Sequence, residues 1–228
     1  MFKPTDLFDL AETAHATLFE DCAYAWDALK GLKAYLATHL EPGLQNRCEG
    51  VAWIGGRVCI GEGTVVEDGA MIKGPAIIGR NCQIRHNAYI REDVIIGDGC
   101  VIGNSSELKS SILFNGCQVP HFNYVGDSIL GHRVHLGAGV KISNLKMVPG
   151  HVMVEIDGQP FDTGLRKLGA VIGDHAEIGC NAVLNPGSIF GRNSLVYAGV
   201  SWRGFLPANM IAKNRAVVEV VERRPRIV

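Results

Sequence analysis

The sequence has little net charge, no long apolar run and no cysteine pair at the spacing of a metal or redox site. Its 228 residues carry a formal net charge of −1, which argues against a nucleic-acid-binding or membrane-surface protein. No secretory leader opens it, and no apolar stretch approaches the length that spans a bilayer. Its seven cysteines, an odd number without CxxC spacing, are typical of free thiols in a reducing compartment. We therefore expect a cytoplasmic protein that binds neither nucleic acid nor membrane.

What the sequence has instead is a period of six residues. From Ile54 to Ile102 every sixth residue is Ile or Val, and a residue that is neither large nor charged follows each of them four positions later. Neither a helix nor a plain strand keeps a period of six, whereas hexads are the signature of a parallel β-helix. Three hexads close one triangular coil, and each coil advances the helix by about 4.8 Å. The period predicts a mainly β fold, a hexapeptide-repeat parallel β-helix.

The pattern divides the chain into three parts. Residues 1–45 are expected to form a helical segment, with an amphipathic helix from Leu18 to Leu40 that covers the open first coil or packs against a neighbouring subunit. Residues 46–205 form the β-helix, interrupted by an excursion over residues 145–170. Residues 206–228 are expected to hold a strand and a basic tail.

The six-residue register fails in the middle of the chain. It breaks between residues 104 and 125, and a new frame starts at Leu130, four positions away from the old one. The excursion that follows contains Asp157-Gly158, a strong hairpin signal. The ladder, meaning the series of aliphatic residues that recur every six positions, resumes at Ile172. Irregularity inside a consistent pattern is where function is expected.

Three polar residues near the break are candidates for chemistry. Because each face of the β-helix recurs every 18 residues, Lys109, His121 and Asn144 can converge although they are far apart in sequence. A neutral imidazole at His121 can take a proton, Lys109 can hold an anion, and Asn144 can orient the histidine or polarise a carbonyl. The alternative for His121 is a corner residue bonded to backbone, and the spacing alone favours neither interpretation.

Metal chemistry is not expected. His121, His132 and His135 lack an HExxH pattern and a cysteine partner at ligand spacing. A structural cation on a trimer axis stays open.

Basic residues outside the break have two interpretations each. Lys167, where the excursion rejoins the β-helix, can reach an anion or face water. Lys213 and Arg215 can meet a cofactor phosphate or lie in solvent.

The irregular region resembles a known family. Residues 103–111, 120–131 and 136–144, which include ProHisPheAsnTyrValGlyAsp, resemble the acetyltransferase domain of bifunctional N-acetylglucosamine-1-phosphate uridyltransferase/glucosamine-1-phosphate acetyltransferase. The return GlyLeuArgLysLeuGlyAlaValIleGlyAsp at residues 164–174 is closer still to archaeal sugar-1-phosphate nucleotidylyltransferase/acetyltransferases. The resemblance covers roughly residues 50–205.

The resemblance implies a left-handed coil, acetyl-CoA as cosubstrate and a homotrimer with active sites between subunits. In such enzymes one histidine acts as general base while the amine of a sugar 1-phosphate attacks the thioester. By this correspondence His121 is the base, Asn144 positions the amine, Arg91, Lys109 and Tyr124 bind the phosphosugar, and Ala138 and Ala198 lie beside the pantetheine arm.

Two departures from the family stand out. His135 takes the place of the asparagine that usually borders the acetyl site, and the helical segment stands where the family has a nucleotidyltransferase domain with a glycine-rich loop. We therefore expect acetyl transfer to an amino-sugar 1-phosphate, without a metal and without nucleotide-sugar synthesis. The alternatives are a non-catalytic subunit that binds a sugar phosphate or nucleotide sugar, and a subunit that serves a separate nucleotidylyltransferase chain.

Overall fold

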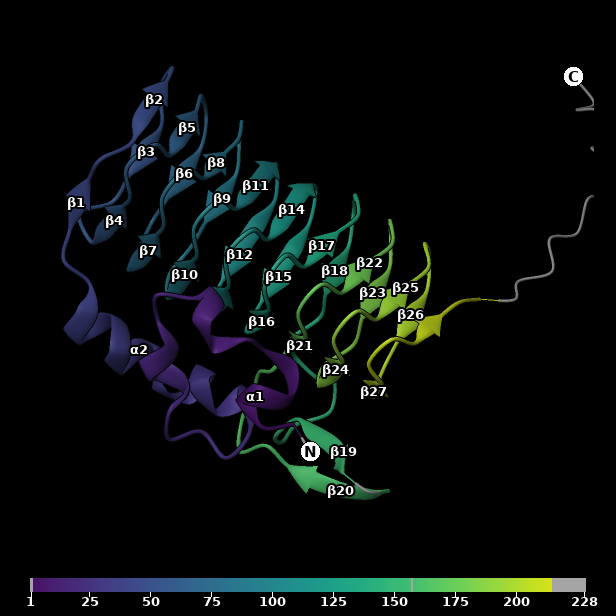
Figure 1. Cartoon of the computed structure of the whole chain (residues 1–228). Helices are drawn as coiled ribbons and strands as arrows, with labels where there is room; N and C mark the ends of the chain where they lie inside the picture. The colour runs from purple at the N-terminus through teal and green to yellow at the C-terminus, as the bar shows by residue number, and fades with distance from the viewer. Residues whose placement is uncertain (1, 157, 215–228) are drawn as a thin grey trace, which may run out of the picture.

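The computed structural model describes residues 2–156 and 158–214. Three parallel sheets form the sides of a long prism (Figure 1). Face A contains β1 (Gly43–Leu44), β4 (Val58–Ile60), β7 (Ala76–Ile78), β10 (Val94–Ile96), β13 (Ser111–Leu113), β16 (Ile129–Leu130), β21 (Ala170–Ile172), β24 (Ser188–Phe190) and β27 (Phe205–Leu206).

The other two faces follow each face A strand in chain order. Face B contains β2 (Arg47–Glu49), β5 (Val65–Glu67), β8 (Gln83–Ile84), β11 (Val101–Asn104), β14 (Gln118–His121), β17 (His135–Leu136), β22 (Glu177–Ile178), β25 (Leu195–Val196) and β28 (Ile211–Ala212). Face C contains β3 (Trp53–Ile54), β6 (Met71–Ile72), β9 (Tyr89–Ile90), β12 (Glu107–Lys109), β15 (Tyr124–Gly126), β18 (Lys141–Ile142), β23 (Val183–Leu184) and β26 (Ser201–Trp202).

The predicted fold, a left-handed parallel β-helix with an N-terminal helical segment, is confirmed. The hexad aliphatics stack in the interior, where Ile60, Ile78 and Ile96 are Cα partners on successive coils and are each at most 1% exposed. A buried side chain of this size contributes about 1.5–3 kcal/mol, so the ladder supplies most of the interior core. The paired strands extend beyond residues 46 and 205, from Gly43 to Ala212. The strand expected near the C-terminus lies outside the described residues.

Two shortened corners explain the break in register. Leu113 follows Leu108 by five positions, and Leu130 follows Val125 by five, whereas successive aliphatic residues from Ile54 to Ile102 are six positions apart. Both lie at the corner where face C turns into face A, here called the C–A corner. Each removes one residue, so the frame moves back by two positions, which in a period of six is the same as moving forward by four. The ladder itself stays continuous, because Leu113 still pairs with Ile96 and with Leu130.

The excursion leaves from the same C–A corner. Thirty residues separate Ile142 on face C from Ile172 on face A, yet Ile172 pairs directly with Leu130. The expected hairpin is present as the antiparallel pair β19 (Met153–Ile156) and β20 (Gln159–Asp162). A long insertion at a corner therefore leaves the pairing of successive coils intact.

The N-terminal segment covers the side of the prism (Figure 1). Phe8, Trp26 and Leu32 belong to a second core together with the outward side chains of face A, among them Ile112 and Ile129. The segment contains α1 (Pro4–Leu7), the 3₁₀ turns η1 (Leu10–Glu12), η2 (Ala16–Phe19) and η3 (Ala25–Asp27), and α2 (Ala28–His39).

Two expectations for this segment are wrong. It does not cover the first coil, where Leu44 is 56% exposed, Val51 82% and Trp53 53%. The outward face A side chains are themselves aliphatic, and they supply the apolar partner for the segment. Helix α2 also begins at Ala28 instead of Leu18, because the chain before it turns at η3, where the Asp27 carboxylate accepts from Tyr24 N at 2.9 Å.

No helix within the described residues combines the length and the apolar character needed to cross a bilayer.

Candidate functional site

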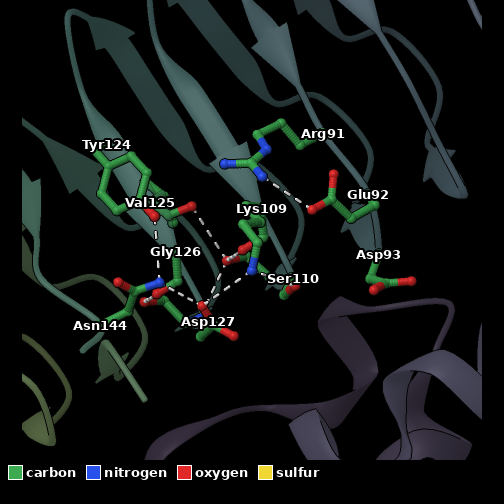
Figure 2. A network of polar contacts seen from close by, with 12 residues as sticks. Arg91, Glu92, Asp93, Lys109, Ser110, Tyr124, Val125, Gly126, Asp127 and Asn144 are labelled. Carbon is green, nitrogen blue, oxygen red and sulfur yellow. Dashed lines mark hydrogen bonds and ion pairs between the residues drawn. The ribbon is translucent and has the colours of Figure 1, made fainter. Parts of the chain in front are cut away.

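Polar side chains from successive coils meet at the C–A corner (Figure 2). Lys109 ends β12, Asp127 follows β15 and Asn144 follows β18. The Lys109 ammonium lies 3.7 Å from Asp127 Oδ2. The Asn144 amide donates to the same carboxylate oxygen and to the Tyr124 hydroxyl, the latter at 3.3 Å. Asp127 therefore joins a cation and an amide on either side of it.

Tyr124 is the half-buried member of this cluster. Burial, and next the charge of Glu107, raise the pKa of the Tyr124 hydroxyl above its usual range. The phenol therefore stays protonated at neutral pH and can donate to a ligand while its oxygen accepts from Asn144.

Arg91 lies on the neighbouring coil and is already paired. Its guanidinium donates to Glu107 at 2.9 Å and to Glu92 at 3.1 Å. These two carboxylates more than balance its charge in the single chain. Lys109, by contrast, faces one carboxylate at a longer distance.

His121 lies at a different corner, where face B turns into face C, here called the B–C corner. Asn123, only 2% exposed, fixes the local backbone: its Oδ1 accepts from His121 N at 3.0 Å and its Nδ2 donates to Gly137 O at 2.7 Å. The His121 ring is exposed and makes no hydrogen bond within residues 2–156 and 158–214. The ring is thus free for chemistry, and its bonding to backbone, the structural alternative, is not observed.

Small residues continue the B–C corner beyond His121. His121, Ala138, Cys180 and Ala198 take equivalent places on successive coils. The pairings are Gly139 N to His121 O at 2.9 Å, Asn181 N to Ala138 O at 2.8 Å and Gly199 N to Cys180 O at 2.8 Å. We call these four residues the B–C track.

A groove runs along part of this track. It encloses about 330 Å³ and is lined in part by His135, Cys180 and Ala198. Lys213 follows β28, the last described strand of face B, and Arg215 lies outside the described residues.

The structure brings together only some of the predicted site residues. Lys109, Tyr124 and Asn144 meet around Asp127, and Lys167 lines a cavity with Lys109 and Asp127. His121 does not join them within one chain. It is separated from Asp127 by strand β15, which spans roughly 10 Å for its three residues.

Two further residues belong to the site, although the sequence pattern assigned them no role. Asn123 takes the small inward corner place that Ala88 and Ser106 fill on the coils before it, so a polar amide there was the available signal. Asp127 lies inside the second shortened corner, and the five-residue interval from Val125 to Leu130 marked it.

The other two candidate histidines, His132 and His135, point in different directions. His132 faces Glu12 at 3.3 Å beside the N-terminal segment, whereas His135 points out from face B. In the part of the chain that the structure describes, no three His, Cys, Asp or Glu side chains gather as a metal ion would require.

Two family models and several curated proteins match parts of the chain. Residues 72–158 match the GMPPB C-terminal domain, and residues 169–201 match the hexapeptide repeat of succinyl-transferase. Over 180 residues the chain is 47% identical to the bifunctional protein GlmU of Methanococcus maripaludis strain C7 and 41% identical to that of strain S2. Each alignment covers 79% of this chain and 43% of the relative.

Over these 180 residues the chain is homologous to part of the GlmU proteins. It is also 40% identical over 95 residues to the bifunctional sugar-1-phosphate nucleotidylyltransferase/acetyltransferase of Sulfurisphaera tokodaii, across 42% of this chain and 24% of that protein. The predicted resemblance is thus confirmed for the acetyltransferase-like region. The chain spans less than half the length of these relatives.

One solved structure matches the chain at low similarity. The crystal structure of PerB from Caulobacter crescentus, in complex with CoA and GDP-perosamine, aligns with 74% of this chain and 53% of its own. The sequence identity is 20% and the TM-score is 0.31, so this likeness carries no functional argument.

Proposed function

We propose that the chain is an acetyl-CoA-dependent N-acetyltransferase acting on an amino-sugar 1-phosphate. The observation that carries the proposal is the B–C track, in which an exposed histidine ring is followed on later coils by Ala138 and Ala198. The homology to GlmU proteins and to a sugar-1-phosphate nucleotidylyltransferase/acetyltransferase supports it.

Acetyl-CoA lies along the track in this proposal. Ala138 and Ala198 leave room for the narrow pantetheine arm, and the groove beside Ala198 encloses about 330 Å³. Lys213, one coil beyond Ala198, binds a phosphate of the cosubstrate together with Arg215. His135, at the edge of the groove, replaces the expected asparagine and borders the acetyl group.

The acceptor binds across face C. Lys109 and Lys167 hold its phosphate, while Tyr124 and Asn144 orient the sugar and its amine. Arg91 acts on the acceptor site indirectly. It pairs with Glu107, which is the Cα partner of Tyr124 on the adjacent strand.

The reaction needs proximity and one base. The acceptor nitrogen attacks the thioester carbonyl while His121 accepts the proton that the nitrogen loses. The new C–N bond forms, the C–S bond breaks, and the proton passes from His121 to the departing thiolate of CoA. Orientation and general base catalysis are sufficient for aminolysis of a thioester, so the proposal requires no metal.

The separation of the two corners bears on assembly. Within one chain His121 and Lys109 lie on opposite edges of face C. We propose a homotrimer in which the B–C track of one subunit and the C–A corner of another border the same cleft. A separate nucleotidylyltransferase is a further proposed partner, since the name of the Sulfurisphaera tokodaii relative includes that activity.

The experiment is a direct transfer assay. Purified protein is incubated with acetyl-CoA and glucosamine 1-phosphate, and release of free thiol is followed. Wild type should turn over, and His121→Ala should lose about 10²–10⁴-fold in kcat. Normal turnover by His121→Ala would remove His121 from the mechanism. A wild type that binds glucosamine 1-phosphate but neither binds CoA nor releases thiol would be the non-catalytic subunit.

A further inference from the structure

A cavity of about 380 Å³ lies between helix α2 and the C–A corner. Four lysines and two aspartates line it: Lys30 and Lys33 from α2, Lys109 and Asp127 from the corner, Asp93 from the coil before, and Lys167 from the end of the excursion. Two of these lysines come from the N-terminal segment, which the proposed mechanism does not use.

The cations around this cavity outnumber the anions. Lys30 pairs with Asp27, outside the lining, at 2.7 Å. Lys33 lies 3.6 Å from Asp93, Lys109 lies 3.7 Å from Asp127, and Lys167 has no ion-pair partner in the described part of the chain. Three further lysines thus face two carboxylates, which leaves one positive charge uncompensated.

The two lysine–aspartate contacts at the wall are also loose. A tight charge-assisted hydrogen bond measures about 2.7–2.9 Å, which is shorter than the Lys33 and Lys109 contacts at 3.6 and 3.7 Å. Each ammonium carries three donors, so both retain donors for an additional anion. The lining favours a ligand that brings negative charge.

Helix α2 holds its lysines at this cavity by its own packing. Leu32 and Leu36 are at most 2% exposed in the core against face A, which fixes the rotation of the helix. Lys30 and Lys33, three positions apart, are neighbours on the helix surface. The Lys33 side chain is 81% exposed and the Lys30 side chain 45%, so both can swing toward a ligand at the rim.

We propose that α2 completes the phosphate site of the acceptor, with Lys33 and Lys30 joining Lys109 and Lys167. The ligand class is a sugar phosphate monoester, and the cavity falls within the range of about 300–1,000 Å³ that small-molecule sites occupy. This inference rests on the proposed function, since it names the residues that select a phosphorylated acceptor. Asp127 links the cavity to Asn144 and Tyr124, which orient the rest of the sugar (Figure 2).

The test compares Lys30→Gln, Lys33→Gln and the double variant with wild type. Lys3→Gln, an exposed lysine of the same segment outside the cavity lining, is the control. Binding of glucosamine 1-phosphate and of inorganic phosphate is measured by calorimetry at low and high salt. The double variant should bind both about tenfold more weakly and show less salt dependence, because rim charges act mainly through screened attraction. Lys3→Gln should match wild type.

A transfer assay then separates this inference from the proposed function. With glucosamine 1-phosphate the double variant should show a KM raised about tenfold at unchanged kcat, while its KM for unphosphorylated glucosamine should not change. Transfer by wild type with an unchanged KM in the double variant would overturn the inference and leave the function standing. If phosphate binding weakens in the double variant but wild type transfers no acetyl group, the proposed function is overturned and the inference stands. Failure of wild type to bind either phosphate would also overturn the inference.

Discussion

The Tyr124 hydroxyl lies 2.7 Å from the point that a Cβ at Gly126 would occupy. The tyrosine ring therefore lies over its neighbour on the same strand, and the Asn144 amide nitrogen is 2.6 Å from the same point. The hydrogen bond between Tyr124 and Asn144 exists only because residue 126 has no side chain.

Replacement of Gly126 by alanine tests this relationship. The nearest atoms to the new methyl group belong to two side chains and not to backbone, so the Tm should change little while the Tyr124–Asn144 hydrogen bond is lost. We expect the KM for glucosamine 1-phosphate to rise about fivefold, the cost of one lost hydrogen bond of roughly 1 kcal/mol. Gly56→Ala is the matched control, because a Cβ there meets nothing within 4 Å. Equal KM values in both variants would contradict the role of this contact.

The B–C track should be sensitive to side-chain size. Ala198→Leu fills part of the groove that it shares with His135 and Cys180, so the KM for acetyl-CoA should rise at least about tenfold. The KM for the acceptor should not change. Ala208→Leu, an exposed position outside this groove, is the control. If steady-state kinetics show the two variants to be alike, the cosubstrate does not lie along this track.

The stability of the N-terminal segment should depend on pH through His15. Burial, and next the charge of His39, lower the pKa of His15 below its ordinary 6.5. As the pH falls through 6.5, the unfolded chain binds a proton at this histidine before the folded chain does. The contribution of neutral His15 to stability is therefore complete above pH 6.5 and decreases as the pH falls from 6.5 to the pKa of the folded state. Thermal unfolding at pH 7.5 and 5.5 should show a smaller drop in Tm for His15→Gln than for wild type. An equal drop would assign the pH dependence to other groups.

The second core should carry a measurable share of stability. Leu36, 0% exposed, packs α2 into the second core on face A, and Leu36→Ala should lower the free energy of unfolding by about 2–5 kcal/mol. Leu44→Ala, 56% exposed on the first coil, should cost less than about 0.5 kcal/mol. Urea denaturation measures both. Similar losses would mean that α2 contributes little to the folded state.

The sequence predicted the scaffold well because its pattern is local. An aliphatic residue in every sixth position fixes which side chains point inward, and the period persists on both sides of the break. The hairpin was predictable for the same reason, since Asp157-Gly158 is a strong turn signal on its own.

The packing of the helical segment was not predictable in this way. The apolar side chains around Trp26 and Leu32 show that one side of the segment is buried, but not against what. The partner is the set of outward aliphatic side chains on face A, such as Ile112 and Ile129. These residues leave the six-residue repeat unchanged, so the repeat does not reveal that a second segment packs on them.

The candidate site was predicted in part. An 18-residue coil places Lys109 near Asn144 to a good approximation, and the structure joins them through Asp127. The corner on which each residue lies depends on the two shortened intervals. In the sequence these two intervals are visible only as a shifted frame, and a shifted frame alone predicts that His121 joins the same cluster.

Separation of the two corners has a consequence for how such a protein can diversify. Leu130 pairs with Ile172 across an excursion, and Leu113 pairs with its neighbours across shortened turns, so lengthening or shortening the C–A corner leaves the coil stack unchanged. The B–C track lies on a corner that no such change touches. Selection can therefore remodel the side proposed to recognise the acceptor by insertion and deletion, while the side proposed to hold the acyl donor is inherited intact.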